Sequence, residues 1–184
     1  MKKFLMIARI LYDKGYTVYV EAAKRIRIEN PDVEFFLLGQ IDEEYPNHVP
    51  AEVVKKHNDA GYIHYLGFTN DVRSVILSVD CIVHPTFYNE GMSRVLMEAM
   101  ALQKPIITTD IPGCKEMVDE GKNGYLIKPK DITSLLEALR LFISLSAEEQ
   151  QIMGYNGRKK VEHDFDVQKV IEVYRNITKE IYNE

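Results

Sequence analysis

Cysteine is scarce in this sequence, and long apolar runs are missing. Its 184 residues include two cysteines, Cys81 and Cys114, which lie far apart and without the spacing of metal ligands. This scarcity excludes a disulfide framework and indicates a reducing, cytoplasmic setting. No apolar run approaches the length of a membrane span. The opening segment MKKFLMIARI is interrupted by Arg9 and lacks a small-residue cleavage site, so we do not interpret it as a signal peptide.

The sequence has only a small excess of acidic over basic residues, and several common motifs are missing. The net charge of −5 argues against a general nucleic-acid binder, although a local basic pocket could hold a phosphate. Without a GxSxG elbow, a P-loop or GxGxxG, the common hydrolase, NTPase and dinucleotide-binding classes are disfavoured. The histidines are scattered, and only His84, at the end of a predicted strand, is a candidate site residue. The acidic triplet 164–166 lies between helical segments, where Asp166 is better explained as a helix cap.

The sequence does contain a regular alternation of short apolar runs and longer amphipathic stretches. The apolar runs predict strands over 4–8, 34–38, 62–66, 81–84, 105–109 and 124–127. Helical spacing between and after them predicts helices over 16–29, 49–60, 71–79, 92–102 and 133–143. Beyond 127 we expect helices only, over roughly 131–183. This order predicts one α/β domain over residues 1–184, a Rossmann-like, doubly wound parallel sheet with C-terminal helices.

Two glutamates, Glu90 and Glu98, bracket the loop after the predicted strand 81–84. Their spacing also occurs elsewhere in this acidic chain, at Glu21/Glu29, Glu44/Glu52 and Glu172/Glu180. Only Glu90 and Glu98 are predicted to flank a helix N-terminus at the edge where parallel sheets bind ligands. We expect this helix to begin near Gly91 or Met92, where free N–H groups attract an anion such as a diphosphate.

In this prediction the loop and helix contact a ligand that is anionic in the middle and polar at both ends. Glu98, about two turns into the helix and about 10 Å from Glu90 along its axis, could accept hydrogen bonds from a ribose diol. Gly91 would let the backbone approach the ligand closely, and Ser93 could add a hydroxyl.

The loop after the first predicted strand, ARILYDKGY, is the second candidate. Arg9 and Lys14 lie five residues apart, with Gly15 behind them. A guanidinium fork and an ammonium point charge suit a diphosphate whose negative charge must be stabilised as it leaves. Two solvated surface cations are the alternative, and the residues alone leave both open.

These segments together resemble the C-terminal half of a family-4 retaining glycosyltransferase of the GT-B fold. The resemblance rests on ARILYDKGY, FLLGQ and the long stretch from YLGFTND through EGMSRVLMEAMA and KPIITTD to GYLIKPKD, and it runs from about Lys3 to the final helix. It implies one of two Rossmann-like domains with the reaction between them. The domain resembled here binds the sugar donor, and the N-terminal one binds the acceptor.

The resemblance also implies a role for each residue that matches its motifs. Glu90 corresponds to the glutamate beside the donor sugar, and Glu98 to the one that binds the ribose hydroxyls. Arg9 and Lys14 correspond to the basic pair on the donor diphosphate. The other donor-binding matches are the loop Gly91, Met92 and Ser93, whose backbone N–H groups reach sugar and phosphate, and Leu66 and Gly67, where backbone holds the base.

Two departures from the family stand out. A turn that usually carries glycine has Gln103 here, a change we interpret as structural. The N-terminal acceptor domain is missing from the chain, so we expect either a truncated protein or a natural half-enzyme, and favour truncation. Such a piece should bind donor but transfer little alone, and its last helix, which in the family returns to the N-terminal domain, would lack its partner.

The expected function is therefore sugar transfer with retention, from a nucleotide-sugar donor and without a metal or other cofactor. Similarity to bacterial capsule and lipopolysaccharide transferases suggests a UDP-sugar, a glycan or lipid-linked acceptor, and peripheral association at the inner membrane face. A non-catalytic nucleotide-sugar binding module would share every pocket residue. A receiver-like signalling domain would need acidic loops where ARILYDKG is basic, and an epimerase would need a catalytic base pair that is not identified.

Overall fold

The computed structural model describes residues 1–89 and 91–182. It contains six strands, whose bounds are β1 (Lys2–Ile7), β2 (Val33–Leu38), β3 (His64–Tyr65), β4 (Cys81–His84), β5 (Ile106–Thr109) and β6 (Gly124–Ile127). All pair in parallel, in the order β3-β2-β1-β4-β5-β6. Because the order runs outward in both directions from the β1–β4 pair, the sheet is doubly wound, as predicted.

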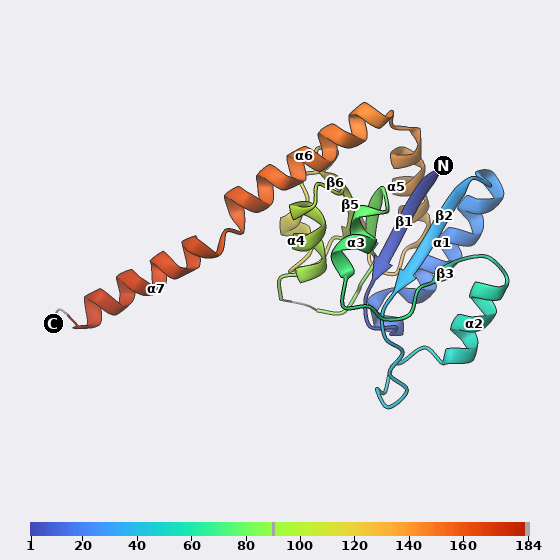
Figure 1. Ribbon diagram of the computed structural model, residues 1–184, viewed down its shortest axis with the longest axis horizontal. Helices are drawn as coiled ribbons and strands as arrows, with labels where there is room; N and C mark the ends of the chain where they lie inside the picture. Colours follow the sequence, from blue (N-terminus) through green and yellow to red (C-terminus); the bar gives the residue numbers. More distant parts are fainter. Residues whose placement is uncertain (90, 183–184) are drawn as a thin grey trace.

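Helices cover both faces of this sheet. The helices of the described residues are α1 (Tyr16–Glu29), α2 (Ala51–Asp59), α3 (Val72–Leu77), α4 (Arg94–Ala101), α5 (Ile132–Ser144), α6 (Ala147–Asp164) and α7 (Val167–Tyr182), with short 3-10 turns at Tyr12–Lys14 and Lys115–Met117. One buried apolar cluster lies under α1 and α5, and a second lies under α3 and α4. Figure 1 shows these helices on either side of the strands.

Aromatic side chains fill the first cluster. The ring of Phe4 stacks on that of Phe35 at 5.1 Å between centroids and meets Phe142 of α5 edge-on at 5.5 Å. The Tyr19 hydroxyl donates to the carbonyls of Phe4 and Phe36, at 3.2 and 2.8 Å, and so ties α1 to two strands. Burial raises the pKa of Tyr19 well above its ordinary value, which keeps this hydroxyl a donor.

The predicted elements are present, and some of their observed bounds differ from the predicted ones. The strands over 81–84 and 124–127 and the helix over 16–29 have the predicted bounds. The strand expected over 62–66 shortens to His64–Tyr65, because it lies at the sheet edge and pairs only with β2. As expected, only helices follow β6 in the described residues.

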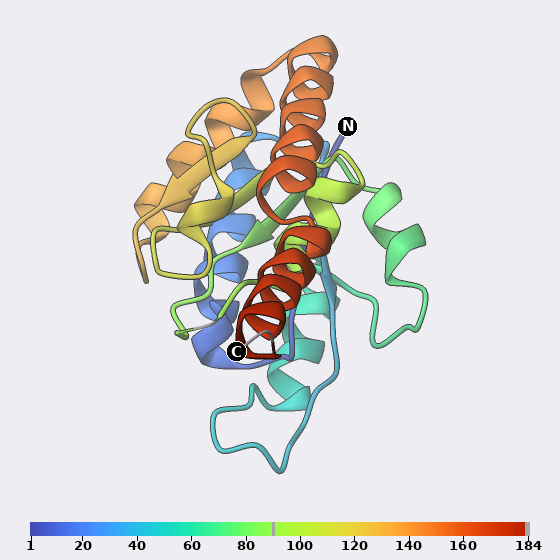
Figure 2. The ribbon, with the colours of Figure 1, turned by 90° about the vertical axis from the view of Figure 1, so that its left-hand side faces the viewer.

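The final helix leaves the body. Figure 1 shows α7 extending outward from the end of α6, and Figure 2 views the molecule from the side on which α7 projects. None of the residues of α7 is buried. Asp166 precedes it and accepts a hydrogen bond from the backbone N–H of Gln168 at 2.9 Å, which confirms the predicted cap. In the part of the chain that the structure covers, no helix is long and apolar enough to cross a membrane.

Candidate functional site

The loops after β1 and β4 are joined at the carboxyl edge of the sheet. The backbone carbonyl of Asp13 accepts from the N–H of Phe87 at 2.9 Å and from the Thr86 hydroxyl at 3.4 Å. Gly15 has φ 87°, and a Cβ there would lie 2.1 Å from the carbonyl oxygen of Pro85. Only glycine therefore allows this approach, which places the two predicted ligand loops side by side.

The predicted cation pair lies on the loop after β1, and each cation lies over a tyrosine ring. The guanidinium carbon of Arg9 is 4.5 Å from the ring centroid of Tyr45, and the ammonium of Lys14 is 4.5 Å from that of Tyr88. A cation over a ring is attracted by the ring quadrupole, typically by about 0.5–1 kcal/mol at exposed sites. The rings thus help to orient both cations at the edge.

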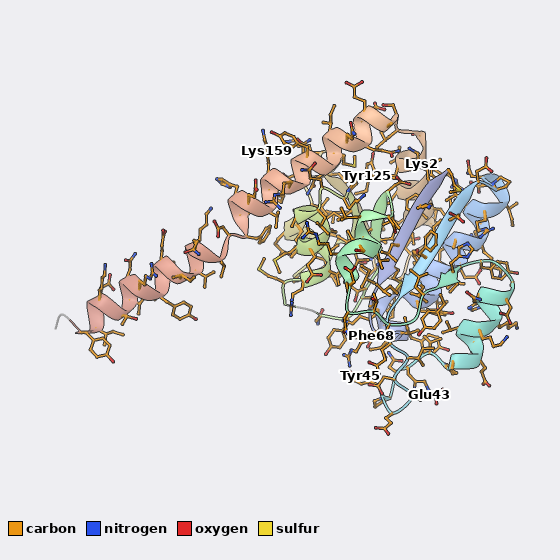
Figure 3. All side chains as sticks on the ribbon, in the orientation of Figure 1. Lys2, Glu43, Tyr45, Phe68, Tyr125 and Lys159 are labelled. Carbon is orange, nitrogen blue, oxygen red and sulfur yellow. The ribbon has the colours of Figure 1, made fainter. Side chains whose placement is uncertain are left out.

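Tyr45 and Tyr88 are site residues that the sequence analysis missed. Tyr45 belongs to the polar loop between β2 and α2, and Figure 3 shows it at the end of the sheet to which β1 and β2 point. It is 36 positions from Arg9 along the chain. No periodicity or motif links two such residues, so only the folded chain could reveal the contact.

Helix α4 begins later than predicted. Its first residue is Arg94, not Gly91 or Met92, and Ser93 is the N-cap with extended backbone angles of −71° and 108°. Glu98 is therefore the fifth helical residue, little more than one turn in, and the axial estimate of about 10 Å, which assumed helix from residue 91, does not apply. Glu90 lies outside the described residues.

Ser93 shows why the helix starts there. Its backbone N–H donates to the Gly113 carbonyl at 3.1 Å, which anchors the turn, while its hydroxyl makes no capping bond. The side chain is buried, and its oxygen has no hydrogen-bond partner within residues 1–89 and 91–182. Buried hydroxyls are usually paired, so this one is available to a ligand or water at the helix N-terminus.

The Glu98 carboxylate is half exposed beside a cavity of about 570 Å³ that Asn70, Val72 and Arg158 help to line. Its contact with Arg94, at 3.8 Å, joins two solvent-exposed groups and is weak. The carboxylate can therefore accept hydrogen bonds from a diol in that cavity without first breaking a strong ion pair.

The predicted base-binding residues follow β3 at the same edge. The N–H of Leu66 donates to the Leu37 carbonyl, and the Gly67 carbonyl accepts from the N–H of Gly39, both at 2.8 Å. These two backbone groups are therefore already used in hydrogen bonds within the protein. The next residue, Phe68, exposes 67% of its surface, a stacking face that the sequence analysis did not identify. Burial raises the pKa of Tyr65, whose hydroxyl donates to the Gly39 carbonyl at 2.9 Å and fixes this turn.

The remaining candidates lie at the end of β4 and in the loop that follows it. His84 ends β4 and is buried. Met92 is half exposed next to Gly91, whose Cβ position faces open space. Within the described ranges, no group of three His, Cys, Asp or Glu side chains could hold a metal ion.

The sequence matches a known family. The model of "Glycosyl transferases group 1" matches residues 1–160, so the chain belongs to that family. One relative is the capsular polysaccharide biosynthesis glycosyltransferase CapM of Staphylococcus aureus, which is 27% identical over 90% of this chain and 43% of its own length. Another is a UDP-Gal:alpha-D-GlcNAc-diphosphoundecaprenol alpha-1,3-galactosyltransferase of Escherichia coli, which is 29% identical over 95% of this chain and 44% of its own length.

A solved structure gives the same fold on its own. The C-terminal domain of a group 1 glycosyl transferase, LpcC, of Francisella tularensis superposes with a TM-score of 0.74 at 22% identity, over 90% of this chain and 87% of that one. The chain spans less than half the length of the two relatives above. Its fold is that of the C-terminal half of a GT-B glycosyltransferase.

Proposed function

We propose that this chain is the donor-binding domain of a retaining glycosyltransferase and that its donor is a UDP-sugar. The observation that carries the proposal is that Arg9 and Lys14 lie on the loop after β1, and that this loop is hydrogen-bonded to the loop that leads to the N-terminus of α4. Glu98 lies further along α4. Cations and a helix N-terminus suit a diphosphate, and a carboxylate suits a ribose diol. The Escherichia coli relative, whose name specifies UDP-Gal, supports the base.

In this proposal each part of the edge contacts one part of the donor. Arg9 and Lys14 bind the diphosphate and stabilise its charge as the sugar departs, in place of a metal ion. Gly91, Met92 and Ser93 lie beside the phosphate and sugar, with Glu90 at the sugar hydroxyls. Phe68 stacks on the base next to Leu66 and Gly67.

The acceptor belongs to a second domain in this proposal. The names of the two relatives refer to a capsular polysaccharide and to a diphosphoundecaprenol sugar, which supports a glycan or lipid-linked acceptor in bacterial surface polysaccharide synthesis. A lipid-linked acceptor would place the complete enzyme in the cytoplasm, at the inner face of the membrane. The chain by itself would then bind donor and transfer little.

A non-catalytic nucleotide-sugar binding module is the second candidate. It would use the same donor-binding residues, so binding to this chain alone does not distinguish it from an enzyme. Sugar transfer by a protein that also contains an acceptor domain would separate the two.

Calorimetric titration of the chain with UDP and with uridine tests the shared donor site. Glu98→Ala should weaken both ligands about ten- to a hundredfold, because a ribose hydrogen bond to a charged group contributes about 1.5–3 kcal/mol. Arg9→Ala should weaken UDP far more than uridine, which has no phosphate. Glu180→Ala, from another pair with the same spacing, and Arg25→Ala, on the exposed side of α1, should change neither.

Equal weakening of UDP and uridine by Arg9→Ala would contradict the diphosphate role. Full affinity for uridine in Glu98→Ala would contradict the ribose role. If the wild-type chain binds neither ligand, it is not a donor-binding domain by itself.

A further inference from the structure

A third cation lies over an aromatic ring at the same edge. Lys130 follows the carboxyl end of β6, and its ammonium is 4.5 Å from the ring centroid of Phe87. Phe87 is the neighbour of Tyr88, the ring beneath Lys14. Two consecutive aromatic residues of the loop 85–89 thus each contact the ammonium group of a lysine, and the two lysines follow different strands of the sheet.

The strand order shows from which sides the two lysines reach this loop. Lys14 follows β1, and Lys130 follows β6, while the loop itself follows β4. In the sheet, β4 lies between β1 on one side and β5 and β6 on the other. Neighbouring strands are about 4.8 Å apart, so Lys130 reaches back across β5 to stand over Phe87. The two lysines therefore reach the loop that leads to the N-terminus of α4 from strands on opposite sides of β4.

The backbone of Lys130 is an independent indication. Its φ is 59°, in the left-handed region, and Gln103 is the one other non-glycine residue with positive φ in residues 1–89 and 91–182. This conformation disfavours a residue with a Cβ by about 1–2 kcal/mol, and such residues cluster at functional sites. Glycine or asparagine would fit the turn better, so the fold alone does not explain a lysine there.

The charge of Lys130 is left available. Its neighbour Asp131 accepts a hydrogen bond from the Ser134 N–H at 3.1 Å and so serves as the N-cap of α5. No carboxylate forms an ion pair with Lys130 in the described part of the chain. The ring of Phe87 orients the ammonium but does not neutralise it.

We propose that Lys130 binds a phosphate group, on the side of loop 85–89 opposite to Lys14. The inference rests on the donor site proposed above, which brings phosphate to this loop. The phosphate is either part of the donor diphosphate or part of a second, acceptor-type ligand placed beyond it. A lysine binds either as a point charge.

The test compares Lys130→Asn with Lys159→Asn. Asparagine tolerates the left-handed backbone and removes the charge. Lys159 is the matched control, because its ammonium lies 4.6 Å from the Tyr155 ring on α6, away from the carboxyl edge (Figure 3). Each variant is titrated calorimetrically with UDP, and then with inorganic pyrophosphate after saturation with UDP, at low and high salt.

Lys130→Asn should weaken one of these ligands about five- to tenfold and reduce the salt dependence of its binding, whereas Lys159→Asn should match wild type. Weaker UDP binding identifies the donor diphosphate, and weaker pyrophosphate binding identifies a second phosphate ligand. Lys130→Arg should restore most of the loss in either arm.

The inference is overturned if Lys130→Asn binds both ligands as Lys159→Asn does. If wild type binds pyrophosphate through Lys130 but does not bind UDP, the donor proposal fails while the Lys130 site stands. If wild type binds neither ligand, both are wrong.

Discussion

Helices α6 and α7 follow each other in the chain, are of similar length, and differ in what holds them. Helix α6 buries Met153, Gly154 and Gly157 against the body, and the guanidinium of Arg158 donates to the carbonyl of Ala101 at the end of α4, at 2.7 Å. Helix α7 buries no residue. Yet α7 carries an apolar stripe at intervals of three and four residues, formed by Val167, Val170, Tyr174, Ile177 and Ile181.

The difference shows that an amphipathic pattern predicts a face but not its partner. Helix α6 has few apolar residues and is nevertheless fixed, because Gly154 allows its backbone to approach the backbone at Gln103. The residues of the α7 stripe are about half to two-thirds exposed, from 47% at Ile177 to 68% at Tyr174. Because its stripe is exposed, α7 receives little stabilisation from packing on the body. An isolated helix of this length is only marginally stable in water.

The largest expected contrast is in amide hydrogen exchange. Amides in the middle of α6 should open only with the body, whereas those of α7 should open by local fraying. The central α7 amides should therefore exchange at least about a thousandfold faster, which corresponds to about 4 kcal/mol. Mass spectrometry of peptides from the two helices would measure it. Equal protection would mean that α7 packs on a surface, such as a second copy of the chain.

Breaking the α6 contact should lower stability next most. A Cβ at Gly154 would lie 2.0 Å from the backbone oxygen of Gln103, whereas one at Gly157 would be 3.6 Å from the Met100 side chain. Gly154→Ala should lower the free energy of unfolding by about 2–3 kcal/mol through overpacking. Gly157→Ala should raise it by about 0.5–1 kcal/mol through helix propensity.

Chemical denaturation of the two alanine variants would measure this contrast. Equal stabilisation of both variants would contradict the prediction, because it would mean that the turn at Gln103 can move to make room for the extra methyl group.

The sequence predicts those parts of the protein that depend on local pattern. Buried apolar runs such as 81–84 and 124–127 mark strands because parallel strands are apolar on both faces, and the doubly wound order follows from their alternation with helices. The loops that hold Arg9 and Lys14 could be located for the same reason. Their function as ligand groups remains a prediction.

The sequence fails where a boundary or contact depends on distant backbone. The start of α4 is set by the Ser93 N–H bond to Gly113, twenty residues away, which no helical period reports. The rings beneath Arg9 and Lys130 lie in other loops, at Tyr45 and Phe87. Such contacts arise only when the sheet brings the loop ends together.

A smaller gain is expected at the turn against which α6 packs. Gln103 has φ 57°, in the left-handed region, directly after the C-cap of α4, where glycine is favoured. Gln103→Gly should raise the free energy of unfolding by about 0.5–1 kcal/mol. Glycine relieves the backbone strain of the left-handed conformation, and the greater entropy of the unfolded chain offsets part of that gain. Gln151→Gly, within α6, should lower it by about 1 kcal/mol. A loss at both positions in thermal unfolding would show that Gln103 is not strained.

Removing α7 should have the smallest effect. A chain ending at Asp166 loses no buried side chain, so its free energy of unfolding should stay within about 0.5 kcal/mol of the full chain, as is usual for changes to exposed groups. Affinity for UDP should also be unchanged, because the proposed donor residues precede α6. Ending the chain at Leu145 instead removes α6 with its Gly154 and Arg158 contacts, and should abolish cooperative unfolding. Should the shorter removal destabilise the body as the longer one does, α7 would be part of the folded unit, and the contrast between the two helices would be wrong.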